Sequence, residues 1–218
     1  MQIAIGLYPD LTLLDVIGPY QVLTLVPDVD VVLCAAERGR LTDDNGLVHL
    51  DVEHTFDDVP EPDALLVGGG LGTRRLMRPG TDIVEWIRAA DAHTTWTTSV
   101  CTGSLLLGAA GLLEGRQATT HWNAVRHLES FGATYSGDRV VTDGKIVTAA
   151  GVSAGIDMAL ALVARLQGDE VAQAVQLGIE YDPQPPFDTG SPRVAPADLV
   201  AFVAGVMDAE EARLLGSG

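Results

Sequence analysis

The sequence has few basic residues, and almost none of them are lysines. Thirteen Lys and Arg residues stand against thirty Asp and Glu residues, so the formal net charge is −17, and Lys145 is the only lysine. A protein that binds DNA, RNA or anionic lipid needs a basic patch that meets the phosphates. The composition therefore predicts neither a nucleic-acid partner nor a membrane partner. Adaptation to high salt and a GC-rich genome both produce such an acidic, lysine-poor composition, and the sequence does not separate them.

Cysteines and long apolar runs are also scarce. Two cysteines, Cys34 and Cys101, cannot build a disulfide framework for 218 residues. No window reaches 18 uninterrupted apolar residues, and the opening MQIAIGLYPD has the pattern of a strand without the basic start of a signal peptide. We therefore expect a protein of the cytoplasm that does not span a membrane.

Apolar residues, in contrast, are plentiful. They make up 47% of the chain against 20% charged residues, which is the composition of a globular protein. A length of 218 residues predicts one large domain. We expect this single domain over residues 1–218, with a core over about 1–180, a Pro-rich arm over 181–195 and a C-terminal helix over 197–215.

Short apolar runs alternate with helical patterns along the chain, which is typical of βαβ units. Strands are predicted over residues 2–7, 29–36, 63–67, 94–100, 139–142 and 145–149, with an extended or hairpin segment over 48–54. Helices are predicted over residues 13–26, 81–92 (with Thr81 as its N-cap), 102–113, 121–131, 154–166, 169–177 and 197–215. The pattern predicts an α/β fold of three layers, with a doubly wound, mostly parallel sheet of the flavodoxin type.

Cys101 stands at the predicted junction between a strand and a helix. Open α/β sheets place their sites at the carboxyl ends of the strands, and a residue at such a corner has a strained backbone and an outward side chain, as in a nucleophile elbow. Gly103 allows the helix to approach closely, and the free N–H groups of the first helical turn favour a thiolate, so we expect a lowered pKa for Cys101. Cys34 lies inside a strand among apolar neighbours and is predicted to be a core residue.

Two further loops are expected at the same edge of the sheet. Gly68, Gly69, Gly70 and Gly72 follow a predicted strand, and their bare backbone can direct N–H groups at a substrate. Their place after the third strand does not fit a dinucleotide fingerprint, so NAD is not predicted. Asp15 lies among apolar residues in the other loop, where a carboxylate is costly unless it has a partner or a task. It either accepts a backbone hydrogen bond or acts as a general acid–base with a raised pKa.

His121 follows Cys101 by twenty positions. It is a candidate base beside the cysteine, and it equally fits a structural or pocket-lining group near a helix N-terminus. The spacing of the remaining histidines does not match that of metal ligands, so no metal site is predicted: His49, His54, His93 and His127.

Several segments together resemble the ThiJ/PfpI superfamily, whose fold is like that of class I glutamine amidotransferases, and within it the isocyanide hydratases. The resemblance covers about residues 3–195. Its segments are Leu14-Asp15 with Gly18-Pro19, the glycines at 68–72, and residues 98–104, 107–113, 118–122, 155–157, 185–187 and 190–192. The segments at 98–104 and 118–122 are shared with amidase-like sensor domains of transcription regulators. Asp15 is more specific, because many relatives have a glutamate in this loop.

The resemblance implies a reaction and a set of site residues. An isocyanide, R–N≡C, is hydrated to an N-substituted formamide through a thioimidate on the cysteine, without a metal or organic cofactor. Cys101 is the implied nucleophile, Asp15 the acid–base and Thr102 a hydrogen-bonding residue near the reactive centre. The implied partners are a small-molecule substrate and a second copy of the chain in a homodimer. The implied substrate-binding residues are Gly69, Gly70, Leu71, His121, Trp122 and Ile156.

The sequence also departs from the family pattern and leaves alternatives open. Gly68 stands where the family has proline, and Arg74 and Arg75 add positive charge that we expect to favour an anionic substrate. Another cysteine enzyme of this fold remains an alternative: an amidase, a peptidase, a glyoxalase or a deglycase. Thr102 in place of histidine argues against the peptidase, and Asp15 in place of glutamate against the glyoxalase. The third hypothesis is a redox sensor in which Cys101 is oxidised without catalysis.

Overall fold

A seven-stranded sheet forms the centre of the protein. The computed structural model describes residues 1–216, and the strand order is β10-β11-β7-β6-β1-β2-β5. Every neighbouring pair is parallel except β10 and β11, which form an antiparallel edge hairpin. The strands are β1 (Gln2–Gly6), β2 (Asp30–Ala35), β5 (His54–Thr55), β6 (Ala64–Val67), β7 (Trp96–Val100), β10 (Val140–Asp143) and β11 (Ile146–Ala149).

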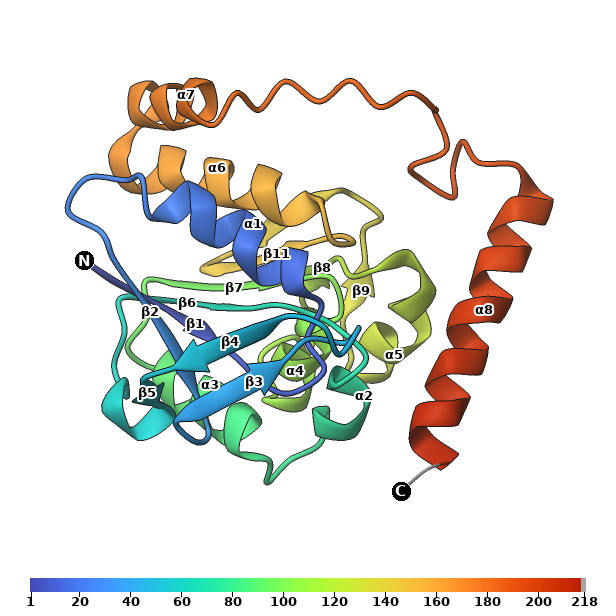
Figure 1. The fold of residues 1–218 in the computed structure, drawn as a ribbon, viewed down its shortest axis with the longest axis horizontal. Coiled ribbons are helices and arrows are strands. Elements are labelled where there is room, and N and C mark those ends of the chain that lie inside the picture. The colour runs from blue at the N-terminus through green and yellow to red at the C-terminus, as the bar shows by residue number, and fades with distance from the viewer. Residues whose placement is uncertain (217–218) are drawn as a thin grey trace.

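Helices cover both faces of this sheet, so the predicted three-layer α/β/α architecture is confirmed (Figure 1). One face carries α1 (Leu13–Leu23) and α6 (Ala154–Gln167), with α7 (Asp169–Gly178) packed on α6. The other face carries α3 (Asp82–Asp91) and α4 (Gly103–Ala109). The helix α5 (Val125–Ser130) packs beside α4.

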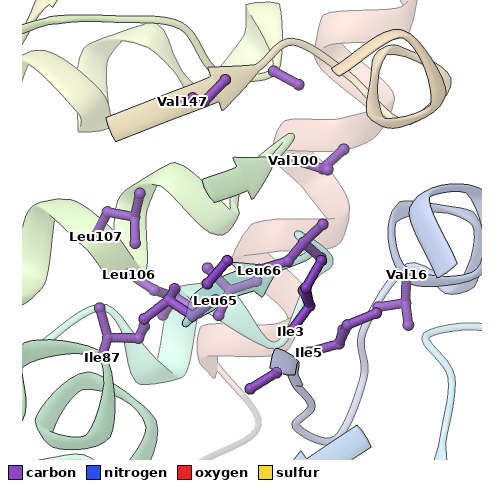
Figure 2. Packing of buried hydrophobic residues seen from close by; sticks show 14 of the residues in the cluster. Ile3, Ile5, Val16, Leu65, Leu66, Ile87, Val100, Leu106, Leu107 and Val147 are labelled. Carbon is purple, nitrogen blue, oxygen red and sulfur yellow. The ribbon is translucent and has the colours of Figure 1, made fainter. Parts of the chain in front are cut away.

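The central strands β1 and β6 are mostly apolar because helices exclude water from both of their faces. All four residues of β6 are fully buried, as are Ile3 and Ile5 of β1. Figure 2 shows Ile3 and Ile5 of β1 and Leu65 and Leu66 of β6. Around them lie Ile87 and Leu106 from one helical layer and Val16 from the other. The sheet is therefore a rigid base for the loops that leave its edge.

The strand order places a topological switch point between β1 and β6. From β1 the chain crosses to β2 on one side, whereas β6, β7 and β11 follow one another on the other side. In such sheets the crevice above the carboxyl ends of the two central strands is where ligands bind. The loops at this edge are residues 7–12 after β1, residues 68–72 after β6 and the β7–α4 corner.

The extended or hairpin segment predicted over residues 48–54 is confirmed: it contains β4 (His49–Val52), which forms an antiparallel hairpin with β3 (Gly39–Thr42). The structure adds short elements that the sequence did not predict, such as β3 itself and β8 (Gln117–Ala118), which pairs with β9 (Thr134–Tyr135). Two short helical turns, η1 (Phe56–Asp58) and α2 (Thr73–Leu76), follow β5 and the glycine loop. The segment predicted as one helix over 121–131 begins with the 3₁₀ turn η2 (Trp122–Ala124).

Thr81 occupies the N-cap position of α3, as predicted, but its side chain does not cap the helix. Its hydroxyl donates to the carbonyl oxygens of Leu76 and Arg78 and thereby closes the preceding turn.

The predicted C-terminal helix is α8 (Ala197–Gly216), and it stands apart from the sheet (Figure 1). An extended segment without helix or strand, residues 180–196, leads from α7 across the molecule to α8. The helix lies beside α2, at the same end of the molecule as the switch point. Within residues 1–216, no helix combines the length and the apolar character needed to cross a membrane.

Candidate active site

Cys101 occupies a strained corner between β7 and α4. Its φ angle is 57°, in the left-handed region that non-glycine residues rarely adopt. Four hydrogen bonds hold this backbone: the N–H donates to the carbonyl oxygens of Ala149 and Ala150, and the carbonyl accepts from the hydroxyls of Ser104 and Thr120. The predicted nucleophile elbow is therefore present, and the neighbouring strand and loops keep it in place.

The residue after next, Gly103, makes this corner possible. A Cβ atom at Gly103 would lie 2.3 Å from the carbonyl oxygen of Val67, so any other residue would push α4 away from β6. The prediction that Gly103 allows a close approach is confirmed.

Asp15 lies in the first turn of α1 and is fully buried. Its Oδ2 accepts a hydrogen bond of 2.7 Å from the N–H of Gly69. The carboxyl group lies against the thiol of Cys101, close enough that each group changes the other's affinity for protons. The other oxygen, Oδ1, is buried without a hydrogen-bond partner among residues 1–216. One carboxylate oxygen is therefore anchored, and the other is not committed to the fold.

Burial controls the protonation of this pair. It raises the pKa of Asp15 to about 7, against the lowering effect of the Gly69 hydrogen bond. Burial, followed by the charge of Asp15, also raises the pKa of Cys101, against the lowering effect of the N–H groups of Val152 and Thr102. The expected lowering by the helix N-terminus is wrong, because the seven-residue α4 cannot offset the loss of solvent. The pair therefore retains a proton at neutral pH.

The glycine loop after β6 holds the reactive groups in position. The N–H of Gly69 is bonded to Asp15, and the N–H of Gly70 donates to Oγ1 of Thr102 at 3.0 Å. A Cβ atom at Gly69 would lie 2.5 Å from the backbone nitrogen of Thr102. We expected these two N–H groups to face a substrate; instead they hold the carboxylate and the threonine in place.

A cavity of about 440 Å³ opens above Cys101. Of the predicted site residues, Thr102, Gly70, Leu71 and His121 line it together with the cysteine. The structure does not place Asp15, Gly69, Trp122 or Ile156 in this lining. Trp122 lines a neighbouring cavity of about 380 Å³, which also contacts His121. Ile156 packs against Gly18 of α1, where a Cβ atom would lie 3.1 Å from its Cγ1.

His121 is neutral in this structure and accepts a hydrogen bond. Its Nδ1 accepts the N–H of Asn123, so the ring proton resides on Nε2. Burial, and then the charge of Arg74, lowers the pKa of His121 to about 4. Of the two roles left open for His121, this geometry favours lining the pocket over acting as a base.

Sequence reasoning missed several parts of the site. The N–H of Val152 acts to lower the pKa of Cys101, and Val152 has a φ of 31°, which is unusual for a β-branched residue. The hydroxyl of Tyr8 donates to the carbonyl oxygen of Gly68 at 2.7 Å behind the reactive pair. Helix α8 also supplies part of the cavity wall: Met207, Glu210, Glu211 and Arg213. Tyr8 could have been predicted as a site residue, because it directly follows the first strand. Nothing in the sequence predicted the contributions of Val152 and α8.

Arg74 connects α8 to the site. Its Nε lies 2.9 Å from Oε2 of Glu211, and the side chains are only 8% and 11% exposed. Arg75, its neighbour in α2, lies outside the cavity lining and contacts Asp10 and the carbonyl oxygen of Leu214. The two arginines therefore differ: Arg74 faces the site, and Arg75 faces solvent.

The second cysteine is a core residue, as predicted. Cys34 is buried in β2, its Sγ lies 3.7 Å from the carbonyl oxygen of Ile5, and burial raises its pKa to about 12. Both cysteines are free thiols. Among residues 1–216, no group of His, Cys, Asp and Glu side chains is arranged to hold a metal ion.

Comparison with known families supports the resemblance drawn from the sequence. Residues 1–165 match the model of the DJ-1/PfpI family. The chain belongs to the DJ-1/PfpI family. The elbow at Cys101 and the buried acid opposite it are thus features of a DJ-1/PfpI protein, and the flavodoxin-like sheet is the fold of this family.

Individual DJ-1/PfpI relatives show how far the similarity extends. An isonitrile hydratase of Pseudomonas putida is 46% identical over 200 residues, which cover 92% of this chain and 87% of the relative. The HTH-type transcriptional regulator CdhR of Pseudomonas aeruginosa is 32% identical over 146 residues, covering 65% of this chain and 42% of the regulator. The crystal structure of a ThiJ/PfpI family protein from Pseudomonas syringae superposes with a TM-score of 0.91 at 34% identity, covering 96% of this chain and 87% of that one.

Proposed function

We propose that this protein is an isocyanide hydratase, which adds water to R–N≡C and releases an N-substituted formamide. The observation that carries the proposal is the buried carboxyl group of Asp15 against the thiol of Cys101 at the elbow. The 46% identity to an isonitrile hydratase over nearly the whole chain supports the same reaction. Isonitrile and isocyanide are two names for one functional group.

In the first half of the reaction Cys101 attacks the terminal carbon of the isocyanide. The thiol proton passes to the carboxylate of Asp15 and from there to the same carbon, while sulfur forms the new C–S bond. The product is a thioimidate, R–N=CH–S–Cys101. A carboxyl group with a pKa near 7 is suited to this task, because it accepts and returns a proton with little cost in either direction.

In the second half water attacks the thioimidate carbon. Asp15 accepts a proton from the water and passes it to the nitrogen, which gives a tetrahedral adduct that carries OH, S and NH–R. The C–S bond then breaks, the C=O bond forms, and R–NH–CHO leaves while the thiol regains its proton. The N–H groups of Val152 and Thr102 stabilise the sulfur whenever it is negative. The steps balance without a metal or an organic cofactor.

The chemistry of the thiol favours an enzyme over a redox sensor. Peroxide oxidises thiolates, and sensor cysteines are accessible and have a low pKa. Cys101 is buried, and burial raises its pKa. A thiol that stays protonated reacts more readily with a substrate whose attack is coupled to proton transfer through Asp15 than with peroxide.

Two variants test the proposal. Cys101→Ala and Asp15→Asn should each abolish hydration of an alkyl isocyanide, followed by the appearance of the formamide in NMR spectra. Thr134→Ser, an exposed change in β9, is a control that should keep full activity. Full activity in Asp15→Asn would disprove the proton transfer, and stoichiometric consumption of peroxide without turnover of any isocyanide would support the sensor.

We further propose that the protein works as a homodimer in the cytoplasm. Exposed apolar side chains on the arm and α8 support an oligomer: Phe187, Val194, Leu199, Phe202 and Val206. The two free thiols support a reducing compartment. Light scattering that gives the mass of a single chain would disprove the dimer.

A further inference from the structure

Tyr8 is a buried titratable residue that the proposed mechanism does not use. It follows β1 closely in the chain, and only 3% of its surface is exposed. Its hydroxyl donates a hydrogen bond of 2.7 Å to the carbonyl oxygen of Gly68. Burial, and then the negative charges nearby, raises the pKa of Tyr8 well above its usual value. The phenol therefore keeps its proton and remains a hydrogen-bond donor at neutral pH.

The hydrogen bond from Tyr8 and the one to Asp15 belong to a single peptide group. The carbonyl of Gly68 accepts from Tyr8, and the N–H of Gly69 in the same peptide group donates to Oδ2 of Asp15 at 2.7 Å. The C=O and N–H of a trans peptide point in opposite directions, so the peptide group lies between the phenol and the carboxyl group. Hydrogen bonds in such a chain polarise one another, and a donor at the carbonyl oxygen strengthens the N–H as a donor. The phenol thus acts on the carboxyl group across one peptide group.

This peptide group depends on its hydrogen bonds for orientation because it joins two glycines. Neither Gly68 nor Gly69 has a side chain that limits the rotation of the bond between them. Gly68 also stands where the family has proline, whose ring would restrain the backbone at this point. If the peptide group turned over, a carbonyl oxygen would face Asp15 in place of the N–H, and the two acceptors would repel each other. The hydrogen bond from Tyr8 opposes this rotation.

The charges around Asp15 show why this peptide group matters. Three other side chains act electrostatically on Tyr8, on Asp15 or on both: Cys101 of the elbow, Asp44 of the loop between β3 and β4, and Arg74 of α2. Burial is the largest influence on the pKa of Asp15 and raises it, and the charge of Asp44 raises it further. The N–H of Gly69 is the largest influence that lowers this pKa, ahead of Cys101. A weaker donor at Gly69 therefore makes Asp15 easier to protonate.

We propose that Tyr8 is a positioning residue for the hydration: its hydroxyl holds the peptide group between Gly68 and Gly69, so that Oδ2 of Asp15 stays bound and Oδ1 stays free for proton transfer with Cys101. Of the described residues, those that line the cavity above Cys101 do not include Tyr8, so it acts through Asp15. The effect on the reaction rate rests on the proposed hydratase function. The effect on the protonation of Asp15 is a property of the protein without substrate.

Tyr8→Phe removes the hydroxyl and keeps the ring. Carbon-13 NMR follows the titration of the Asp15 carboxyl carbon without substrate, and the signal is identified by its absence from Asp15→Asn. We expect the midpoint to rise by roughly 0.3 to 0.6 of a pH unit in Tyr8→Phe, because the Gly69 donor becomes weaker. Tyr20→Phe, which removes a hydroxyl further along α1, is the matched control and should leave the midpoint unchanged.

Hydration of n-pentyl isocyanide gives the second readout. In the proposed mechanism the carboxylate of Asp15 accepts the thiol proton, so kcat/KM falls at low pH as Asp15 becomes protonated. Tyr8→Phe should move this acid limb to higher pH by the same amount as the NMR midpoint. We expect kcat at neutral pH to fall by roughly three- to tenfold, the effect of one hydrogen bond, and KM to change by less than about twofold, since Tyr8 does not line the cavity.

An unchanged or lowered midpoint in Tyr8→Phe would overturn the inference. A loss of kcat that is equal at every pH would accompany that result, because a purely structural role for Tyr8 does not alter the protonation of Asp15. An equal rise of the midpoint in Tyr20→Phe would also overturn it, since the effect would not be specific to the bond at Gly68. A raised midpoint in Tyr8→Phe alone, in a protein that hydrates no isocyanide, would support the positioning of Asp15 and reject the proposed function.

Discussion

The pairing of Asp15 with Cys101 decides the chemistry at the scale of single residues. Each group is more easily protonated than usual, chiefly because burial removes the water that would stabilise its charge. A buried carboxylate that serves the reaction therefore lowers the free energy of unfolding. The sequence indicated both halves of this arrangement: an acid among apolar residues and a cysteine at a corner. It did not indicate that burial would outweigh the short helix at Cys101.

The raised pKa of Asp15 predicts how the stability of the protein depends on pH. The pKa of Asp15 is about 7 in the folded protein, against 3.8 for an aspartate in an unfolded chain. Folding therefore favours the protonated acid, and this stabilisation is complete below pH 4 and is lost as the pH rises through 7. We expect Asp15→Asn to be more stable than the wild type at pH 8, by an amount on the order of 4 kcal/mol, and to lose this advantage near pH 4.

Urea unfolding at several pH values measures this difference. Asp188→Asn, which removes an exposed carboxylate from the arm, is the control and should change stability little at any pH. A stability gain in Asp15→Asn that does not depend on pH would show that packing, not charge, is responsible.

At the scale of elements, the loop after β6 links the acid of α1 to the elbow before α4. Gly69 donates to Asp15, and its missing side chain leaves room for the backbone of Thr102. We expect Gly69→Ala to lower kcat/KM for isocyanide hydration by roughly a hundredfold, because a displacement of about 1 Å at a reactive group has that effect.

The matched control is Gly178→Ala at the end of α7, where a Cβ atom would meet nothing within 4 Å. It should keep full activity and a melting temperature close to that of the wild type. Wild-type activity in Gly69→Ala would mean that the loop does not position the catalytic pair.

The same scale shows which elements a sequence can predict. The strands β1, β2 and β6 were predicted because they appear as apolar runs, and β7 was predicted from its β-branched residues. Short elements such as β8 and α2 were not predicted, since two to four residues carry no periodicity. Their conformation comes from tertiary contacts, as where α2 begins immediately after the glycine loop.

At the scale of the whole molecule, α8 is attached to the rest of the protein mainly through charged side chains. Glu211 contacts Arg74 at 2.9 Å and His127 at 3.2 Å, whereas the more exposed Asp208 contacts Arg126 at 3.6 Å. Burial, and then Arg74, lowers the pKa of His127, so this histidine does not replace the arginine as a cation at neutral pH. The single pair between Arg74 and Glu211 is therefore the main electrostatic attachment.

We expect Glu211→Ala to accelerate amide hydrogen exchange along α8 by at least about tenfold, because it leaves the Arg74 cation buried and unpaired. Asp208→Ala, the matched control, removes a solvent-screened pair and should change exchange by less than about threefold. Hydrogen-exchange mass spectrometry of peptides from α8 makes the comparison. Equal effects of the two variants would mean that apolar contacts hold the helix.

The sequence did not predict that α8 contributes to the site. Arg74 and Glu211 are 137 positions apart, and neither lies in a sequence motif that predicts their ion pair. The predicted helix itself is correct, yet where it docks depends on an extended segment whose path no local pattern specifies. The reactive centre was predictable because it lies at strand ends, where the fold class alone determines which loops meet.

The position of α8 separates two tasks that many enzymes combine in one set of residues. The reacting groups are held in place by the sheet, whereas much of the outer wall of the cavity is formed by the loosely packed C-terminal helix α8. Drift in that helix can reshape which molecules are admitted while the reaction itself stays intact. Related proteins should therefore differ more in the substrates that they accept than in the reaction that they catalyse. Their sequences should vary most in about the last twenty residues.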